Sequence, residues 1–293
     1  MTAILGGLGA AFLWAAANLA SSRSSRLVGA NSTVAWMMLV GLAVTAPIAF
    51  ISAPVPDITP TLAVWLTAAG FGSVIGLLLL YRGLRIGKIG VVLALASTEG
   101  AISAIFAVIG GESLNMPTAL VLGLIAIGIA TVALAGGSSA APSGDETAPR
   151  SKELSAELRA ALFGAGAAVA FGFSIYGTGR VGMTLPIVLA VMPARVVGVA
   201  FVFVPMALTG RLHLTRQAVP LILIVAAGEV IGNVSYVIGA QQSIAIASVL
   251  ASQFAAVAAV AAFFLFHERL SSGQRSGFVA IAVGLVALTL VRG

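Results

Sequence analysis

Long apolar runs, separated by short polar stretches, follow one another along the whole chain. The hydrocarbon core of a bilayer is about 30 Å thick, and a helix needs about 20 apolar residues to cross it. Ten runs approach that length, and we expect a membrane-spanning helix in each: Ala3–Ala20, Val34–Ile51, Thr61–Gly83, Ile89–Ile109, Pro117–Ala135, Leu158–Gly177, Leu185–Leu208, Ala218–Ala240, Ile244–Phe266 and Gln274–Val291. The pattern predicts an all-α polytopic membrane protein with ten transmembrane helices.

Part of this pattern occurs twice. Residues 72–134 align with residues 228–290 at a constant offset of 156 positions and without a gap. The paired residues include Gly72 and Gly228, Gly76 and Gly232, Gly83 and Gly239, Glu112 and Glu268, and Gly128 and Gly284. Matches between apolar residues are expected in so apolar a chain, whereas matched glycines and a matched glutamate among nine acidic residues are not. A duplicated hydrophobic unit is typical of secondary transporters.

A polar stretch separates the two copies and sets the domain boundaries. The chain divides into a first five-helix repeat (residues 1–136), a polar linker (137–157) and a second five-helix repeat (158–293). Because five is an odd number, the second repeat must enter the membrane upside down relative to the first. We therefore expect two inverted five-helix repeats about an axis in the membrane plane. Both halves of a pathway then lie in one chain, so a monomer is possible.

The composition agrees with a lipid environment. The chain is 60% hydrophobic and 8% charged, with a mean hydropathy of +1.12, whereas a soluble domain carries about 25% charged residues. The net charge of +6 does not indicate nucleic-acid binding, because the basic residues stand singly at the ends of apolar runs. The chain has no cysteine, and its two histidines, His213 and His267, have no spacing that predicts a metal site. We expect no metal, no cofactor and no enzymatic activity.

The basic residues also predict an orientation. Twelve of them fall on one side of the predicted bundle: Arg23, Arg26, Arg82, Arg85, Lys88, Arg150, Lys152, Arg159, Arg211, Arg216, Arg269 and Arg275. Arg180 and Arg292 fall on the other side. Because Lys and Arg are enriched in cytoplasmic loops, the distribution predicts that both termini lie outside the cytoplasm.

Two short motifs resemble the signature of a known family. Residues Gly111–Leu114 (GESL), followed by Gly123 and Gly128, resemble the GE-x-L … G … G signature of the drug/metabolite transporter superfamily, EamA type. Residues His267–Leu270 (HERL), followed by Gly277 and Gly284, repeat the motif in the second half. The resemblance implies a ten-helix transporter of small metabolites in a bacterial-type inner membrane. It also implies that both termini lie in the cytoplasm, contrary to the distribution of basic residues.

A further part of the resemblance concerns two predicted helices. Residues Ser97–Gly100 (STEG) and Ser252–Phe254 (SQF) stand where that family has a Glu-Pro or Gln-Pro helix break, with Gly100 and Phe254 in place of the proline. Within the superfamily the chain is most similar to the YddG-type amino-acid exporters, in length, helix layout and a modestly polar interior. The resemblance implies export of amino acids.

Three ionisable residues lie well inside the apolar runs: Glu99, Arg195 and Glu229. A charge near the middle of a membrane costs a few kcal/mol, so such residues face a cavity or a partner. Glu99 is expected to contact a substrate ammonium group or to bind a proton; alternatively, as a protonated acid, it hydrogen-bonds a neighbouring helix. Arg195 suits a substrate carboxylate, or it forms a structural ion pair with Glu229, which we favour.

Other polar and aromatic residues share helix faces with each other or with these charges. Trp14 and Asn18 are four residues apart, as are Glu229 and Asn233. In lipid such polar faces turn inward. The predicted substrate-binding set is Trp14, Asn18, Ser97, Glu99, Ser174, Tyr176, Arg195, Glu229, Asn233, Tyr236, Ser252 and Gln253.

These features predict a transporter that moves small metabolites, amino acids first, across the cytoplasmic membrane by alternating access through a central cavity. A proton-coupled exporter of cationic drugs is the alternative, since Glu99 or Glu229 could exchange a proton for a cation. A membrane enzyme or a non-transporting scaffold is the alternative of another class. The expected partners are a small-molecule substrate and the lipid bilayer.

Overall fold

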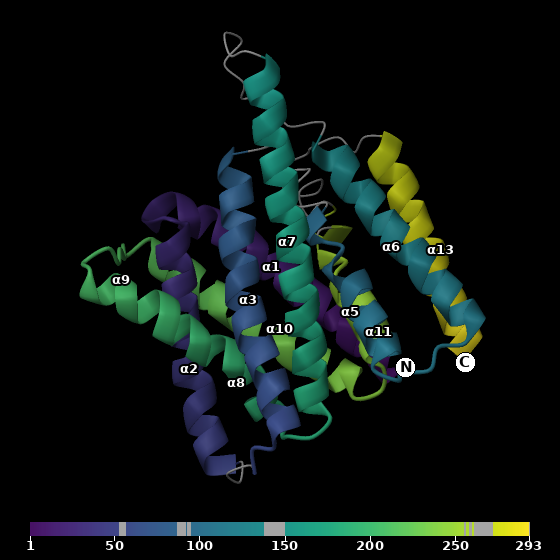
Figure 1. Ribbon diagram of the computed structural model, residues 1–293, viewed down its shortest axis with the longest axis horizontal. Coiled ribbons are helices and arrows are strands. Elements are labelled where there is room, and N and C mark those ends of the chain that lie inside the picture. Colours follow the sequence, from purple (N-terminus) through teal and green to yellow (C-terminus); the bar gives the residue numbers. More distant parts are fainter. Residues whose placement is uncertain are drawn as a thin grey trace.

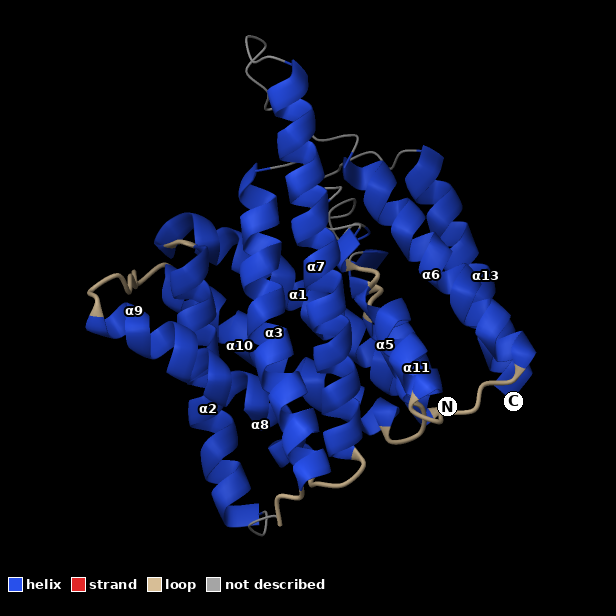
Figure 2. Ribbon diagram, viewed as in Figure 1, coloured by secondary structure: helices blue, strands red, loops and turns tan. Residues whose placement is uncertain are grey.

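The structure, a computed structural model, describes residues 1–52, 57–86, 92, 95–137, 150–254, 256–257, 260 and 272–292. Within these ranges all regular secondary structure is helical (Figure 2). The helices are α1 (Thr2–Val28), α2 (Ala30–Ser52), α3 (Pro60–Ile86), α5 (Glu99–Ile109), α6 (Met116–Gly137), α7 (Arg150–Gly182), α8 (Ile187–Gly198), the π-helix η1 (Val199–Phe203), α9 (Val204–Leu208), α10 (Ala218–Ala240), α11 (Ile244–Ala251) and α13 (Ser272–Arg292).

Six of the described segments are long and apolar enough to cross a membrane: Thr2–Val28, Ala30–Ser52, Pro60–Leu80, Leu158–Gly182, Ile187–Leu208 and Ala218–Ala240. Three shorter apolar helices lie within the fourth, fifth and tenth predicted runs. The predicted boundaries were wrong where a helix continues into polar sequence. α1 extends beyond Ala20, and α7 begins at Arg150, inside the stretch expected to be linker. Lys, Glu, Leu and Ala are good helix formers in water, so a helix can leave the membrane without ending.

The prediction of continuous helices over 89–109 and 244–266 was also wrong. A turn at Ser97 and Thr98 precedes α5, and a turn at Ser252 and Gln253 follows α11. At each turn a hydroxyl donates to a nearby backbone carbonyl: Thr98 Oγ1 to Leu95 O at 2.7 Å, and Ser252 Oγ to Val249 O at 2.9 Å. These bonds compete with the helical ladder, so the breaks form without a proline. Residues 87–91, 93–94 and 261–271 lie outside the described part.

The helices pack in long pairs (Figure 1). α1 runs along α10, α3 along α7, and α6 along α13, while α2 contacts α8 and α5 contacts α11. Small residues permit the close approach. A Cβ at Gly72 of α3 would lie 2.7 Å from the Ala170 carbonyl oxygen of α7, which is too short for any side chain. Close backbone packing of this kind replaces the hydrophobic effect as the force between helices in lipid.

The seventh apolar run is irregular. It contains Pro193 within α8, and it widens into the π-helix Val199–Phe203 before α9. A proline frees one backbone carbonyl, and a π-turn inserts an extra residue, so the regular α-helical hydrogen-bond pattern of this run is interrupted at two places. Arg195, one of the three ionisable residues singled out by the sequence, lies between these two irregularities.

Candidate functional site

The two interrupted helices, α5 and α11, contact each other next to their turns. A Cβ at Gly100 would overlap the Ser248 carbonyl oxygen of α11 and would lie 2.8 Å from Ser252 Cβ. Only glycine allows α5 to start this close to the end of α11. Glu99, the first residue of α5, is thereby buried at 5% exposure. Gln253 is buried at the same crossing, and its Nε2 has no hydrogen-bond partner among the described residues.

Ser97 and Ser252 also lie at this crossing and are buried. Ser252 uses its hydroxyl within its own turn, and Ser97 has an interaction partner of its own. The structure therefore brings together four residues of the predicted set: Ser97, Glu99, Ser252 and Gln253. The Glu99 carboxylate receives no hydrogen bond from the residues that the structure describes.

Arg195 is buried between three helices. Its guanidinium Nη1 donates to the Val191 carbonyl oxygen of its own helix at 3.2 Å. Its stem packs on Gly41 of α2, where a Cβ would lie 3.2 Å from Arg195 Cγ and 3.4 Å from Val230 Cγ2 of α10. In the described part of the chain this side chain makes no salt bridge, and its single hydrogen bond leaves most of its donors unused.

Glu229 is an acidic residue whose charge interacts with Arg195. It lies within electrostatic range of Arg195 and also of Glu99. Asn233 Nδ2 donates to the Glu229 carbonyl oxygen at 2.7 Å and approaches Glu229 Oε2 at 3.5 Å. The two residues therefore share one face of α10, as their spacing predicts. The ion pair expected between Arg195 and Glu229 is not formed as a direct contact; the two charges are near neighbours.

Two members of the predicted set tie helices together. Tyr236 Oη donates to the Ile175 carbonyl oxygen of α7 at 2.9 Å, and Ser174 Oγ donates to the Ala69 carbonyl oxygen of α3 at 2.7 Å. Trp14 packs against the Tyr236 ring with 6.2 Å between centroids, and its buried indole N–H has no partner among the described residues. Asn18, one turn further along α1, is exposed.

One contact between the two halves of the chain could not be found from the sequence. The Glu112 carboxylate caps the start of α11: it accepts the Ser243 hydroxyl on Oε1, and the backbone N–H groups of Ile244 at 3.0 Å and Ala245 at 3.3 Å on Oε2. A carboxylate at a helix N-terminus satisfies orphan donors and complements the helix dipole. The GE-x-L motif singled out Glu112 but gave no indication of its partner, and Glu268 lies outside the described residues.

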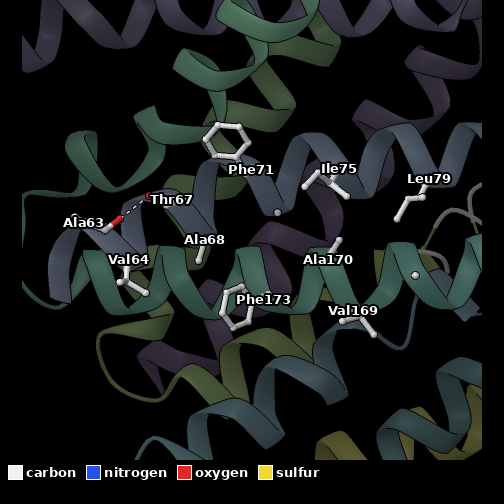
Figure 3. A pocket seen from close by; sticks show the side chains of 12 residues that line it. Ala63, Val64, Thr67, Ala68, Phe71, Ile75, Leu79, Val169, Ala170 and Phe173 are labelled. Atoms are coloured by element: carbon white, nitrogen blue, oxygen red, sulfur yellow. Dashed lines mark hydrogen bonds between the residues drawn. The ribbon is translucent and has the colours of Figure 1, made fainter. Parts of the chain in front are cut away.

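An apolar groove lies elsewhere in the molecule. It has a volume of about 800 Å³ and runs between α3 and α7 (Figure 3). Its wall is almost entirely apolar, and it is lined by Ala63, Val64, Thr67, Ala68, Phe71, Gly72, Ile75, Leu79, Gly166, Val169, Ala170 and Phe173. Val64 and Val169 are each more than half exposed. The groove contains no residue of the predicted set and faces outward, as expected of a lipid-facing surface.

Comparisons with known proteins agree with this architecture. The model of the EamA-like transporter family matches residues 1–134. No curated protein matches the chain. A protein of known crystal structure superimposes with a TM-score of 0.77 at 17% sequence identity, over 99% of this chain and 96% of that one. The chain therefore shares the fold of that solved protein over nearly its whole length, and its first 134 residues are similar to the EamA-like transporters.

Proposed function

We propose that the chain is a secondary transporter with ten membrane-spanning helices in two inverted five-helix repeats. Equivalent contacts in the two halves support the repeat. A Cβ at Gly72 would lie 2.7 Å from the Ala170 carbonyl oxygen, and one at Gly228 would lie 2.9 Å from the Leu13 carbonyl oxygen. Gly72 and Gly228 are 156 positions apart in the sequence, and their partners Leu13 and Ala170 are 157 positions apart. Each contact thus joins one half of the chain to the other at equivalent places.

A second contact has the form that a twofold axis produces. A Cβ at Gly128 would lie 2.9 Å from Ile281 Cγ1, and a Cβ at Gly284 would lie 2.5 Å from Ile125 Cγ1. Each residue of one pair is 156 positions from its equivalent in the other, so the contact is reciprocal. Reciprocal contacts between identical surfaces are the mark of twofold symmetry. This is the arrangement that inverted-repeat transporters build around a central site.

The observation that carries the functional proposal is the place of Arg195 in this symmetry. Gly41 packs on Arg195 Cγ, and Gly198 packs on Met38 Cγ, where a Cβ would lie 2.5 Å away. Both glycines and both partners are 157 positions apart. The Met38 thioether packs on Gly198, and the Arg195 side chain packs on Gly41 at the equivalent place in the other half. An uncharged side chain therefore satisfies this packing, which does not require the charge of Arg195. Because a buried charge is costly, we infer that the guanidinium is retained to bind a substrate.

The charges around Arg195 define the substrate class. A guanidinium binds a carboxylate with paired hydrogen bonds, and most N–H groups of the Arg195 guanidinium make no hydrogen bond within the described residues. Glu229 and Glu99 lie nearby and suit an ammonium group. We therefore assign small zwitterions, amino acids first, as substrates that are moved out of the cytoplasm. We keep Trp14, Asn18, Ser97, Ser174, Tyr176, Asn233, Tyr236, Ser252 and Gln253 as the proposed surroundings of this site.

The proposed mechanism is alternating access. Helices that pack through glycines can rock against one another without large side chains interlocking. The breaks before α5 and after α11 support this mechanism, because transporters of this kind form their sites at the ends of discontinuous helices. Both halves of the pathway lie in one chain, so a monomer can complete the cycle.

The test is counterflow by the purified protein in proteoliposomes. Vesicles loaded with unlabelled alanine should accumulate labelled alanine, whereas vesicles loaded with ethylamine or propionate, which each lack one charged group, should not. The Arg195→Met variant introduces the residue found at the equivalent position of the first half, Met38. This variant should stay folded while losing counterflow. Equal counterflow by Arg195→Met and the parent protein would refute the assigned role of Arg195.

A proton-coupled exporter of cationic drugs is the second candidate. It is favoured by Glu99, a buried carboxyl that receives no hydrogen bond within the described residues and is therefore available to exchange a proton for a cation. Movement of a lipophilic cation driven by a pH gradient, lost in Glu99→Gln, would select this function. The absence of proton-driven cation movement, together with alanine counterflow, would exclude it.

A further inference from the structure

A small polar pocket lies at the end of α5 that is opposite to Glu99. It has a volume of about 210 Å³ and is formed by the turn after α5, the last turns of α7 and the start of α11. Its polar side chains are Glu112, Tyr176, Arg180 and Gln242. Arg180 lies at the end of the bundle to which the sequence assigns few basic residues. Twelve other basic residues at helix ends are assigned to the opposite side.

Arg180 is held by an aromatic ring and not by an acid. Its guanidinium carbon lies 5.8 Å from the centroid of the Trp65 ring. A cation stacked on an indole keeps its N–H edge available for hydrogen bonds. Among the described residues, Arg180 forms neither a salt bridge nor a hydrogen bond. The pocket therefore contains a positioned cation with vacant donors.

Tyr176 supplies a second fixed donor. Its ring makes edge contact with Trp65 at 5.2 Å between centroids and packs on Phe106 at 6.0 Å. Its hydroxyl lies so close to Gly110 that a Cβ there would overlap it. Tyr176 is buried at 4% exposure, and its hydroxyl makes no hydrogen bond within the described part of the chain. A rigid ring thus presents an unused O–H at the pocket that Arg180 lines.

The acid in the pocket is already engaged. Glu112 directs Oε1 to the Ser243 hydroxyl and Oε2 to the N–H groups of Ile244 and Ala245. Its negative charge is balanced by the start of α11, where a helix carries partial positive charge. Arg180, the Tyr176 hydroxyl and the side-chain amide of Gln242 have no hydrogen-bond partner among the described residues, and all three carry donors. Their complement is an acceptor with negative charge.

We propose that this pocket is a carboxylate-binding subsite at one mouth of the transport path, in which Arg180 and Tyr176 hold the carboxylate of the substrate before it reaches, or after it leaves, Arg195. The proposal rests on the proposed transport function. A volume of about 210 Å³ is smaller than the roughly 300–1,000 Å³ of pockets that enclose drug-sized ligands, so it fits a carboxylate with a small side chain. The Trp65 ring holds the Arg180 guanidinium, with 5.8 Å between the guanidinium carbon and the ring centroid, and Arg180 lines the pocket.

Trp65 provides a direct reporter, because the chain has only three tryptophans, Trp14, Trp36 and Trp65. In a Trp14→Phe/Trp36→Phe background, detergent-solubilised protein is titrated with acetate, alanine and methylamine. We expect acetate and alanine to change the Trp65 emission with saturation, and methylamine to leave it unchanged. Arg180→Gln should weaken the acetate response by about tenfold or more, and Arg180→Lys by less. Arg211→Gln, an exposed arginine elsewhere, is the matched control.

The outcomes separate this subsite from the proposed function. A saturable acetate response that persists in Arg195→Met and is lost in Arg180→Gln supports the subsite, even if alanine counterflow fails and refutes amino-acid transport. If neither carboxylate alters Trp65 emission, or if Arg180→Gln responds like the parent protein, the subsite is refuted. Alanine counterflow can persist in that case, and the proposed function then survives without the subsite.

Discussion

The bond network at Glu112 allows a graded test of how the two halves are held together. Glu112 follows α5 in the first half and caps α11 in the second, 131 positions from Ser243. All eight residues of α11 are buried, so water cannot easily replace a lost cap. We compare Glu112→Ala, which removes every acceptor, with Glu112→Gln, which keeps the size of the side chain and one acceptor oxygen.

The expected magnitudes follow from the bonds. A hydrogen bond to a charged group contributes about 1.5–3 kcal/mol, and the three bonds share one carboxylate and are not additive, so Glu112→Ala should cost about 3–5 kcal/mol. In Glu112→Gln the amide oxygen can still accept the N–H groups and the amide can donate to Ser243 Oγ. What is lost is the charge at the helix N-terminus, about 0.3–2 kcal/mol.

The assay is thermal unfolding of purified protein in detergent. With about 2–4 °C per kcal/mol, Glu112→Ala should lower the midpoint by about 6–20 °C, and Glu112→Gln by about 1–8 °C, always by less than Glu112→Ala. Asp57→Asn is the control, because Asp57 is an exposed acid outside the helices. If Glu112→Ala unfolds at the same temperature as Asp57→Asn, the cap does not stabilise α11 and the reasoning fails.

The remaining predictions concern the repeat and the central charges. Gly100→Ala should lower the free energy of unfolding by about 1–3 kcal/mol, because the added Cβ overlaps α11. Gly123→Ala is the control and should be neutral or stabilising, because its Cβ meets nothing within 4 Å. Equal unfolding midpoints of the two variants would contradict the close contact between α5 and α11. If the repeats are inverted, Glu268→Ala should lose stability as Glu112→Ala does, and a midpoint equal to the parent's would argue against equivalence. Glu99→Gln should keep the parent's expression and midpoint but cut alanine counterflow by about tenfold, the loss of one charged contact; unchanged counterflow would remove Glu99 from the site.

The helical architecture was largely accessible from the sequence because lipid imposes a simple rule. A segment without water must satisfy its backbone internally, so apolar length alone predicts helices such as Ala218–Ala240, which the structure reproduces. The same rule could not locate the breaks at Ser97–Thr98 and Ser252–Gln253. There a single hydroxyl bond decides the local backbone, and Ser and Thr also occur within regular helices, as Ser174 does.

The candidate site was accessible in part. A buried charge is conspicuous in an apolar run, and the structure places Glu229 within electrostatic range of both Arg195 and Glu99. Arg180 was interpreted only as a basic residue at a helix end, because nothing local shows that Trp65, 115 positions away, will stack on it. Contacts between distant segments leave no periodic pattern in the sequence. The contact of Glu112 with the start of α11 could not be predicted for the same reason.

The most direct test of the account is counterflow of amino acids in proteoliposomes, measured with and without a pH gradient across the membrane. A facilitative carrier of zwitterions predicts that labelled alanine exchanges against unlabelled alanine at a rate that ignores the gradient and is lost in Arg195→Met. No exchange of any amino acid by folded, reconstituted protein would contradict the account, and proton-driven movement of lipophilic cations in the same vesicles would assign the central charges to drug export.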